Sequence, residues 1–275
     1  MLEIDRWPDL RDPVLVVALS GWVDAGLAGA GAAAVLSDQL GSASEFGRFD
    51  LTDIVDLQQT RPSVRLVDGA TREITWPTVD LIAGRAGRDV VLCHGPEPSL
   101  RWRAFSDELV QMSQQIGVRM MLGLGGMPTL VSHRRPVTVL TTATSRSLAQ
   151  EVGAWRADYT GPTGAQTALQ VAVGHAGIPG VGLWAQVPHY VAATPSPPAI
   201  SALLSRLREL AAIETDLSAL DAQGDEYLRR VEEGLSERPD VAEMVQNIEA
   251  TEDSGEIPTG DELASEIERF LREQG

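Results

Sequence analysis

Residues 19–29 read LSGWVDAGLAG and follow an apolar run, where α/β proteins place phosphate-binding loops and catalytic serines. The dinucleotide fingerprint Gly-x-Gly-x-x-Gly is not met, since the glycines fall at 21, 26, 29 and 31. A nucleophile elbow, Gly-x-Ser-x-Gly, is not met around Ser20. Asp24 is expected to cap the next helix, where its carboxylate would occupy an anion's place. We therefore interpret this segment as a scaffold turn whose Trp22 is partly exposed at a contact surface. Gly26, Gly29, Gly31 and the alanines between them are expected to let the following helix pack closely against the sheet.

A second glycine-rich turn, residues 161–164, precedes another expected helix. The two turns together form the predicted binding or contact loop, with no catalytic residue assigned: Gly21, Trp22, Asp24, Gly26, Gly161, Thr163 and Gly164. The alternative is a phosphorylase- or hydrolase-like enzyme that acts on a small metabolite at the strand ends. Its residues would come from the segments near 20–24, 93–97, 125–128 and 161–164.

Metal and thiol chemistry have weak support in the sequence. The four histidines, at 94, 133, 175 and 189, are isolated, and no His-x-x-x-His or Glu-x-x-His pair occurs. His133 and the pair Arg134–Arg135 are expected in a solvated surface turn, and Cys93 as a small buried residue. The segment GLGGMP (123–128) is interpreted as a tight turn. We expect neither a metal nor a cofactor.

Charge and lysine content limit the function further. All 22 basic side chains are arginine, which removes the lysine of a P-loop and of a Schiff base. The net charge is −17, of which residues 201–275 carry −13 with 20 acids and 7 arginines. Such a surface disfavours nucleic acid and anionic lipid. The first residues lack an apolar signal region, and no apolar run reaches about 18 residues, so a cytoplasmic protein without a membrane span is expected.

These residues need a sheet to position them. Apolar runs predict strands at 13–20, 45–50, 89–95, 118–126, 136–143 and 180–187, and Asp68-Gly69 predicts a hairpin within 63–76. Helices are expected at 24–40, 101–116 and 163–177. This alternation predicts a three-layer α/β/α sandwich.

The C-terminal part differs in composition and is expected to form a helical appendage. We divide the chain into an α/β/α core (1–198), an acidic helical region packed on or beside it (199–249), a linker (250–260) and a C-terminal helix (261–275). Leu263, Ile267, Phe270 and Leu271 would share one face of that last helix.

Three segments, LSGWVDAGLAGAGAA, GPTGAQTAL and GIPGVGLWAQVPHYVAATPSPPAISALLSRL, together with the end of the chain, resemble the proteasome assembly chaperone type-2 family in its bacterial branch. The resemblance implies a phosphorylase/hydrolase-like sandwich and non-catalytic protein binding, with a protein partner or self-association into a homo-oligomer. Relatives that dock on proteasomes end in a hydrophobic-Tyr-any tripeptide, whereas this sequence ends Glu-Gln-Gly. Contact with proteasome subunits would therefore have to use another surface.

Overall fold

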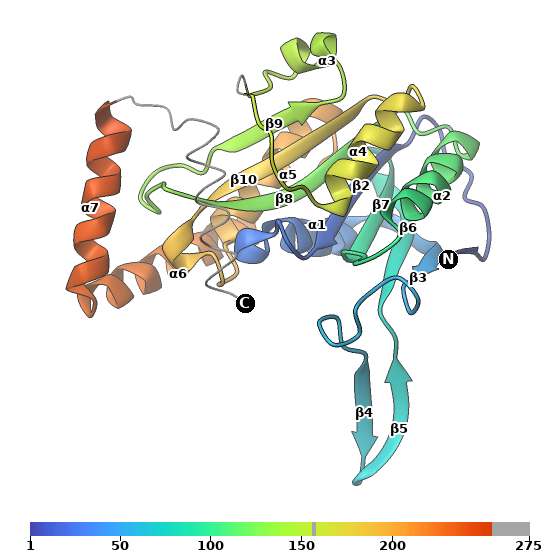
Figure 1. The fold of residues 1–275 in the computed structure, drawn as a ribbon, viewed down its shortest axis with the longest axis horizontal. Helices are drawn as coiled ribbons and strands as arrows, with labels where there is room; N and C mark the ends of the chain where they lie inside the picture. Colours follow the sequence, from blue (N-terminus) through green and yellow to red (C-terminus); the bar gives the residue numbers. More distant parts are fainter. Residues whose placement is uncertain (156–157, 255–275) are drawn as a thin grey trace.

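The computed structural model describes residues 1–155 and 158–254, which fold around an eight-stranded mixed sheet (Figure 1). The strand order is β1-β3-β6-β7-β2-β8-β10-β9, and the four strands β7, β2, β8 and β10 are parallel. The strands span Leu2–Ile4 (β1), Val14–Ser20 (β2), Gly41–Asp50 (β3), Thr78–Ala86 (β6), Arg88–Pro96 (β7), Met120–Thr129 (β8), Val139–Ala143 (β9) and Gly180–Pro188 (β10). All six strands predicted from apolar runs are confirmed.

Strands β1 and β6 escape the sequence analysis. In β6 the buried residues Val79, Leu81 and Ala83 alternate with more exposed ones. That period of two is a genuine strand signal, but Asp80 and Arg85 interrupt the apolar run on which the prediction relied.

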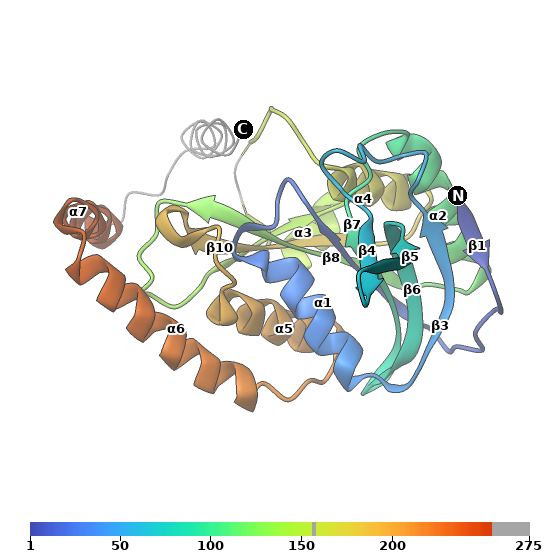
Figure 2. The same ribbon diagram turned by 90° about the horizontal axis from the view of Figure 1, so that it is seen from below.

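Helices cover both faces of the sheet, as Figure 2 shows from below. Helices α1 (Ala28–Gln39) and α5 (Pro197–Ala211) lie on one face, and α2 (Trp102–Gln115) and α4 (Ala165–His175) lie on the other. A short helix, α3 (Arg146–Glu151), follows β9. The predicted three-layer sandwich is confirmed, and each face buries its own apolar cluster.

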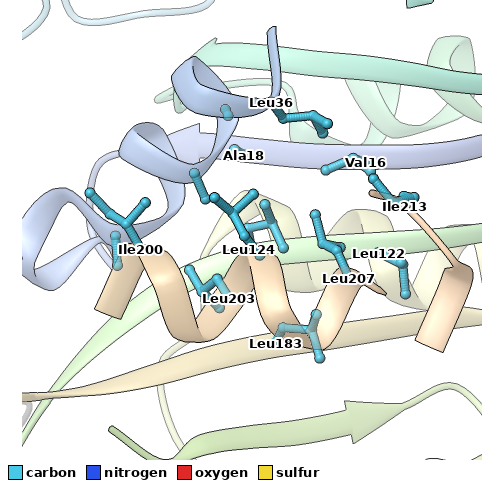
Figure 3. Packing of buried hydrophobic residues seen from close by; sticks show 14 of the residues in the cluster. Val16, Ala18, Leu36, Leu122, Leu124, Leu183, Ile200, Leu203, Leu207 and Ile213 are labelled. Atoms are coloured by element: carbon cyan, nitrogen blue, oxygen red, sulfur yellow. The ribbon is translucent and has the colours of Figure 1, made fainter. Parts of the chain in front are cut away.

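In the apolar cluster on the α1/α5 face, α5 packs against the middle of the sheet (Figure 3). Leu203 and Leu207 of α5 are fully buried with Leu122, Leu124 and Leu183 from β8 and β10. Each such side chain contributes about 1.5–3 kcal/mol relative to an exposed one. Helix α5 is thus a layer of the sandwich, so the helical region that starts near residue 199 begins as part of the α/β/α core.

Helix α1 starts later than the predicted residue 24. Gly26 has φ +65° and Leu27 has φ 46°, so a 3₁₀ turn over Ala25–Leu27 precedes the α-helix. A Cβ at Gly29 would lie 2.6 Å from the Leu124 carbonyl oxygen, and one at Gly31 would lie 2.3 Å from Ile200 Cδ1. The expectation that these glycines allow close packing of the helix is confirmed.

The segment GLGGMP is not a tight turn. It belongs to β8, where residues 123–128 pair in parallel register with residues 182–187 of β10. A Cβ at Gly126 would lie 2.1 Å from the Ala25 carbonyl oxygen. Because these glycines have no Cβ, neighbouring segments can pack closely against the buried strand. Turn propensity, which depends on the local sequence, does not reveal this role.

A β-hairpin projects from the sandwich (Figure 1). Strands β4 (Ser63–Val67) and β5 (Ala70–Thr75) form a separate two-stranded sheet that turns at Asp68-Gly69, which confirms the predicted hairpin. All residues of β5 are exposed, as are four of the five in β4.

The chain continues from α5 into two further helices, α6 (Ser218–Ser236) and α7 (Pro239–Ser254), beside the sandwich. Leu220 of α6 joins the core cluster that contains α5. Helix α7 runs five residues into the stretch 250–260 that we interpreted as a linker. The predicted C-terminal helix (261–275) lies outside the described residues.

The loop at 132–135 contacts these acidic helices. Arg134 and Arg135 are exposed, as expected of a surface turn, whereas the expectation for His133 is wrong. His133 is buried, not superficial: its Nδ1 lies 2.7 Å from the Tyr190 hydroxyl and its Nε2 lies 3.1 Å from Glu232. Arg134 donates from Nε to Glu232 at 2.6 Å and pairs with Glu249. The hydrogen bond from Arg134 lowers the pKa of Glu232 to about 2.

Arg135 extends the same contact to α7, with 2.5 Å between its Nη2 and Asp253 Oδ1. Acidic side chains of α6 and α7 thus pair with two arginines of the core that lie about 100 residues earlier in the sequence. Nothing in the local sequence around residue 134 indicates this long-range pairing.

Candidate functional site

The two predicted turns meet at the carboxylate of Glu97, directly after β7. The backbone N–H of Glu97 donates to the Ser20 carbonyl at 2.8 Å. Its Oε2 accepts from the Trp22 backbone N–H at 3.3 Å, and its Oε1 accepts from that of Ala165 at 2.5 Å. One side chain thus ties the turn after β2 to the first N–H of α4, where a negative charge also meets the positive end of the helix.

Glycines make room for this carboxylate on both sides. A Cβ at Gly21 would lie 2.9 Å from Glu97 Cβ, and a Cβ at Gly164 would lie 2.7 Å from Glu97 Oε1. These distances are shorter than a normal carbon contact, so a larger side chain would displace the carboxylate. The two glycine-rich turns are therefore halves of one arrangement centred on Glu97.

A cavity of about 690 Å³ opens beside Glu97, between α4 and the β9–β10 end of the sheet. The size is typical of small-molecule sites. Its aromatic lining consists of Trp22 from the turn after β2, Trp155 and Tyr159 from the connection between α3 and α4, and Trp184 from β10. Trp184 is buried in β10, Trp22 and Trp155 are half-buried, and Tyr159 is exposed with its hydroxyl donating to the Pro162 carbonyl.

The floor of the cavity exists because of glycines in the sheet. A Cβ at Gly125 of β8 would lie 2.6 Å from the Trp184 ring. A Cβ at Gly182 of β10 would lie 2.6 Å from Thr142 Oγ1 and 2.8 Å from Gln170 Oε1. Strand positions without side chains thus leave space for the indole and for the polar groups of α4.

Polar groups of the cavity come mainly from α4 and β9. The indole N–H of Trp184 donates to Thr142 Oγ1 at 3.3 Å, and Gln170 Nε2 donates to the same oxygen at 3.3 Å. Gln166 is 6% exposed, and its Oε1 accepts from the Leu19 backbone N–H at 3.5 Å. Its Nε2 is buried and has no hydrogen-bond acceptor within the described part of the chain.

Of the seven predicted contact residues, Trp22, Thr163 and Gly164 line this cavity. Gly21 borders it through Glu97, and Gly161 packs against the Tyr159 ring, which a Cβ would approach to 2.5 Å at the hydroxyl. Trp22 is half-buried, as our hypothesis of a partly exposed aromatic requires.

Asp24 lies away from the cavity, buried at the start of α1. Its Oδ1 accepts from the Gly29 backbone N–H at 2.7 Å, and its Oδ2 accepts from that of Ala30 at 3.3 Å. The carboxylate thus satisfies the first turn of the helix as expected, although it does so from four residues before the helix begins. Burial raises the pKa of Asp24 to about 6, against the effect of these two hydrogen bonds.

Gly26 also faces the other side of the sheet. Its N–H donates to the Ala192 carbonyl at 2.6 Å, and its carbonyl accepts from Ser196 N–H at 2.8 Å. It fixes the segment before α5 and takes no part in the cavity. The predicted contact loop therefore separates into a cavity-lining set and a set that anchors α1.

The cavity residues that the sequence analysis did not single out are Glu97, Gln166 and Trp184, although Glu97 ends the segment 93–97 named for the enzymatic alternative. Glu97 had one usable signal: an acidic residue immediately after a buried strand, at the sheet edge where sites form. Gln166 and Trp184 look like ordinary members of an apolar helix and strand. His175 of α4 lines the outer part of the cavity, and Cys93 is buried as expected, with the pKa of its thiol raised by burial.

The described groups of this site can recognise a ligand. Both Glu97 oxygens accept hydrogen bonds from backbone N–H groups, so the carboxylate positions two loops. The Ser20 hydroxyl donates to the Gly95 carbonyl at 3.4 Å. The remaining lining offers aromatic faces and amide groups, which bind ligands by stacking and hydrogen bonding.

Comparison with family models matches residues 18–235 to the PAC2 family. A proteasome-assembly chaperone homologue of Mycobacterium tuberculosis is 39% identical, covers 84% of this chain and 99% of its own, and superposes with a TM-score of 0.78. A comparison with curated proteins gave no significant match.

A second M. tuberculosis protein, described as of unknown function, covers 100% of this chain and 96% of its own, with 29% identity and a TM-score of 0.86. An archaeal proteasome activator of Pyrococcus furiosus shares the fold at 20% identity and a TM-score of 0.64, covering 84% of this chain and 98% of its own. No helix among the described residues is long and apolar enough to cross a membrane. The family match spans most of the chain and both glycine-rich turns, and this protein therefore belongs to the PAC2 family.

Proposed function

We propose that this chain is a non-catalytic assembly factor that binds protein subunits through the β4–β5 hairpin, with proteasome subunits as the partner. The family and the 39% identical proteasome-assembly chaperone homologue support that choice of partner. The observation that carries the proposal is the apolar face of the hairpin.

Four large apolar side chains form this face: Val64, Leu66, Ile74 and Trp76, with exposures of 47–59%. Val64 of β4 pairs directly with Ile74 of β5, and Leu66 lies two residues after Val64 in the same strand. Trp76 lies two residues after Ile74, directly beyond the end of β5. Side chains two residues apart lie on the same face of a strand. We call these four residues the hairpin stripe.

The hairpin stripe has no core beneath it, because the hairpin projects from the sandwich. An isolated two-stranded hairpin is marginally stable in water, and an exposed apolar strip on one is a liability unless it is covered. Its two edges also leave backbone N–H and C=O groups free to add a strand from another chain. Both features favour a protein partner over a small molecule.

The opposite face of the hairpin supplies a matched control. Arg65 and Glu73 pair across the two strands with 4.0 Å between Arg65 Nη1 and Glu73 Oε2, and both side chains are well exposed. Changing this face alters the same hairpin without touching the hairpin stripe.

The test is reconstitution with purified proteasome subunits of the source organism, measured as complex formation by size-exclusion chromatography with light scattering. We expect wild type and the R65S/E73S variant to co-elute with the subunits, and the V64S/I74S variant to elute alone. The same run reports the mass of the chain by itself, for which we propose a homo-oligomer. Equal binding by both variants, or no binding by wild type, would contradict the proposal.

A further inference from the structure

We propose that the cavity beside Glu97 is a binding site for an uncharged planar ring compound that carries a hydrogen-bond acceptor. The inference concerns a small-molecule ligand and is independent of the hairpin and its partner. It starts from the shape and lining of the cavity, which at about 690 Å³ holds a ligand of several fused rings.

The walls select flat apolar surfaces. Trp22, Trp155 and Trp184 account for three of the six tryptophans in the chain, and they approach the same cavity from a turn, a loop and a strand. Aromatic rings that face a cavity bind planar ligands by stacking, in addition to the apolar area that they bury.

The charges select against anions. Glu97 places a carboxylate in the wall, and no arginine lines the cavity among the described residues. Among the described lining residues, His175 is the one with a basic side chain. A phosphate or carboxylate ligand would therefore meet the like charge of Glu97, and the described lining residues offer it no arginine.

The buried amide of Gln166 selects for an acceptor. Gln166 is more than nine-tenths buried and lines the cavity, and its Nε2 has no acceptor within the described chain. An unpaired buried donor carries a free-energy cost. Because Nε2 itself is buried, the amide has to turn toward the cavity for a ligand carbonyl or ring nitrogen to remove that cost. Gln170 and Thr142, by contrast, already satisfy each other.

Three probes of similar size separate these effects: 2-quinolone, naphthalene and 2-naphthoate. Binding to the full chain would be measured by saturation-transfer NMR at equal probe concentrations, with affinities from chemical-shift titration. We expect 2-quinolone to bind most tightly, naphthalene about tenfold more weakly because one hydrogen bond is missing, and 2-naphthoate least. If no probe binds, or if 2-naphthoate binds best, the proposal is wrong.

Variants place the binding in this cavity. Q166L should bring 2-quinolone down to the affinity of naphthalene while naphthalene binding stays unchanged, which a collapsed cavity would not do. Q111L, a matched change on an exposed position of α2, should leave all three affinities as in wild type. V64S/I74S should also leave them unchanged, so that failure of the hairpin proposal and failure of this one are separable. An unaltered preference for 2-quinolone in Q166L would overturn the role of the Gln166 amide.

Discussion

The hairpin stripe and the cavity beside Glu97 use the same kinds of side chain in opposite settings. Trp76 on the hairpin is 47% exposed, whereas Trp184 in the cavity is 8% exposed. The cavity walls are tied to the sheet and to α4 by hydrogen bonds from buried or half-buried groups. Within the described residues, the hairpin is a separate two-stranded sheet whose two ends connect to β3 and β6.

This difference separates two kinds of recognition. A rigid concave site loses little conformational entropy when a small ligand binds. A projecting hairpin pays more to become ordered, but it offers an apolar face and free strand edges to a partner large enough to cover them. The following changes should affect the two regions unequally.

The largest difference should follow removal of a carboxylate. E97A leaves the backbone N–H groups of Trp22 and Ala165 without their acceptor, and we expect it to lower the free energy of unfolding by about 1–3 kcal/mol. E73A, the matched change on the hairpin, should lower it by less than about 0.5 kcal/mol, because its ion pair is exposed. Urea unfolding followed by circular dichroism measures both; equal losses would contradict the comparison.

The buried carboxyl group of Asp24 should make the stability of the folded protein depend on pH. Its folded-state pKa of about 6 lies above the ordinary 3.8, so the folded protein holds the proton more tightly than the unfolded chain. This stabilisation is fully present below pH 3.8 and is lost as the pH rises through about 6.

The variant D24N measures this effect, because its amide keeps an acceptor for α1 but does not titrate. The stability of wild type relative to D24N should fall by on the order of 1–3 kcal/mol between pH 4 and pH 7. The readout is urea unfolding of both proteins at each pH. A difference that stays constant with pH would show that burial does not control this carboxyl.

The acidic helices offer a third, weaker case, since exposed ion pairs hold them to the core. R134Q removes the links to Glu232 and Glu249 and should cost about 0.2–1 kcal/mol, while limited proteolysis within α7 becomes faster. R229Q is the control, because Arg229 pairs only within α6, with Glu226 and Glu233. If both variants are cleaved alike, the loop at 132–135 does not fasten the helices.

The smallest effect on stability should come from the hairpin stripe itself. V64S/I74S removes apolar groups that are already exposed, so the free energy of unfolding should change by no more than about 0.5 kcal/mol. Thermal unfolding by calorimetry checks this expectation. A large loss would mean that the hairpin packs on the body and is not free to bind a partner.

Local patterns in the sequence predicted the layers of the fold well. Apolar runs located the central strands, Asp68-Gly69 located the hairpin turn, and the small residues after Gly26 indicated close packing of α1. Each of these features depends on residues within about ten positions of one another, where periodicity and turn chemistry carry the information.

The features that failed depend on distant partners. GLGG has the composition of a turn, yet it lies in β8 and pairs with β10. Its glycines leave room for the Trp184 ring and the Ala25 backbone. His133 and Arg134 have the composition of a surface loop, yet they face acidic groups about 100 residues away. Glu97 gains its role only when the fold brings residues 20–22 and 164–165 to it.

The most direct test of the central claim is hydrogen–deuterium exchange of the full chain, alone and mixed with purified proteasome subunits. The account predicts fast exchange across residues 63–76 in the free chain and strong protection there in the mixture. Residues 164–175 of the cavity wall should exchange slowly in both samples. Protection that appears elsewhere, or unchanged exchange at residues 63–76, would contradict the proposal that the hairpin binds the partner.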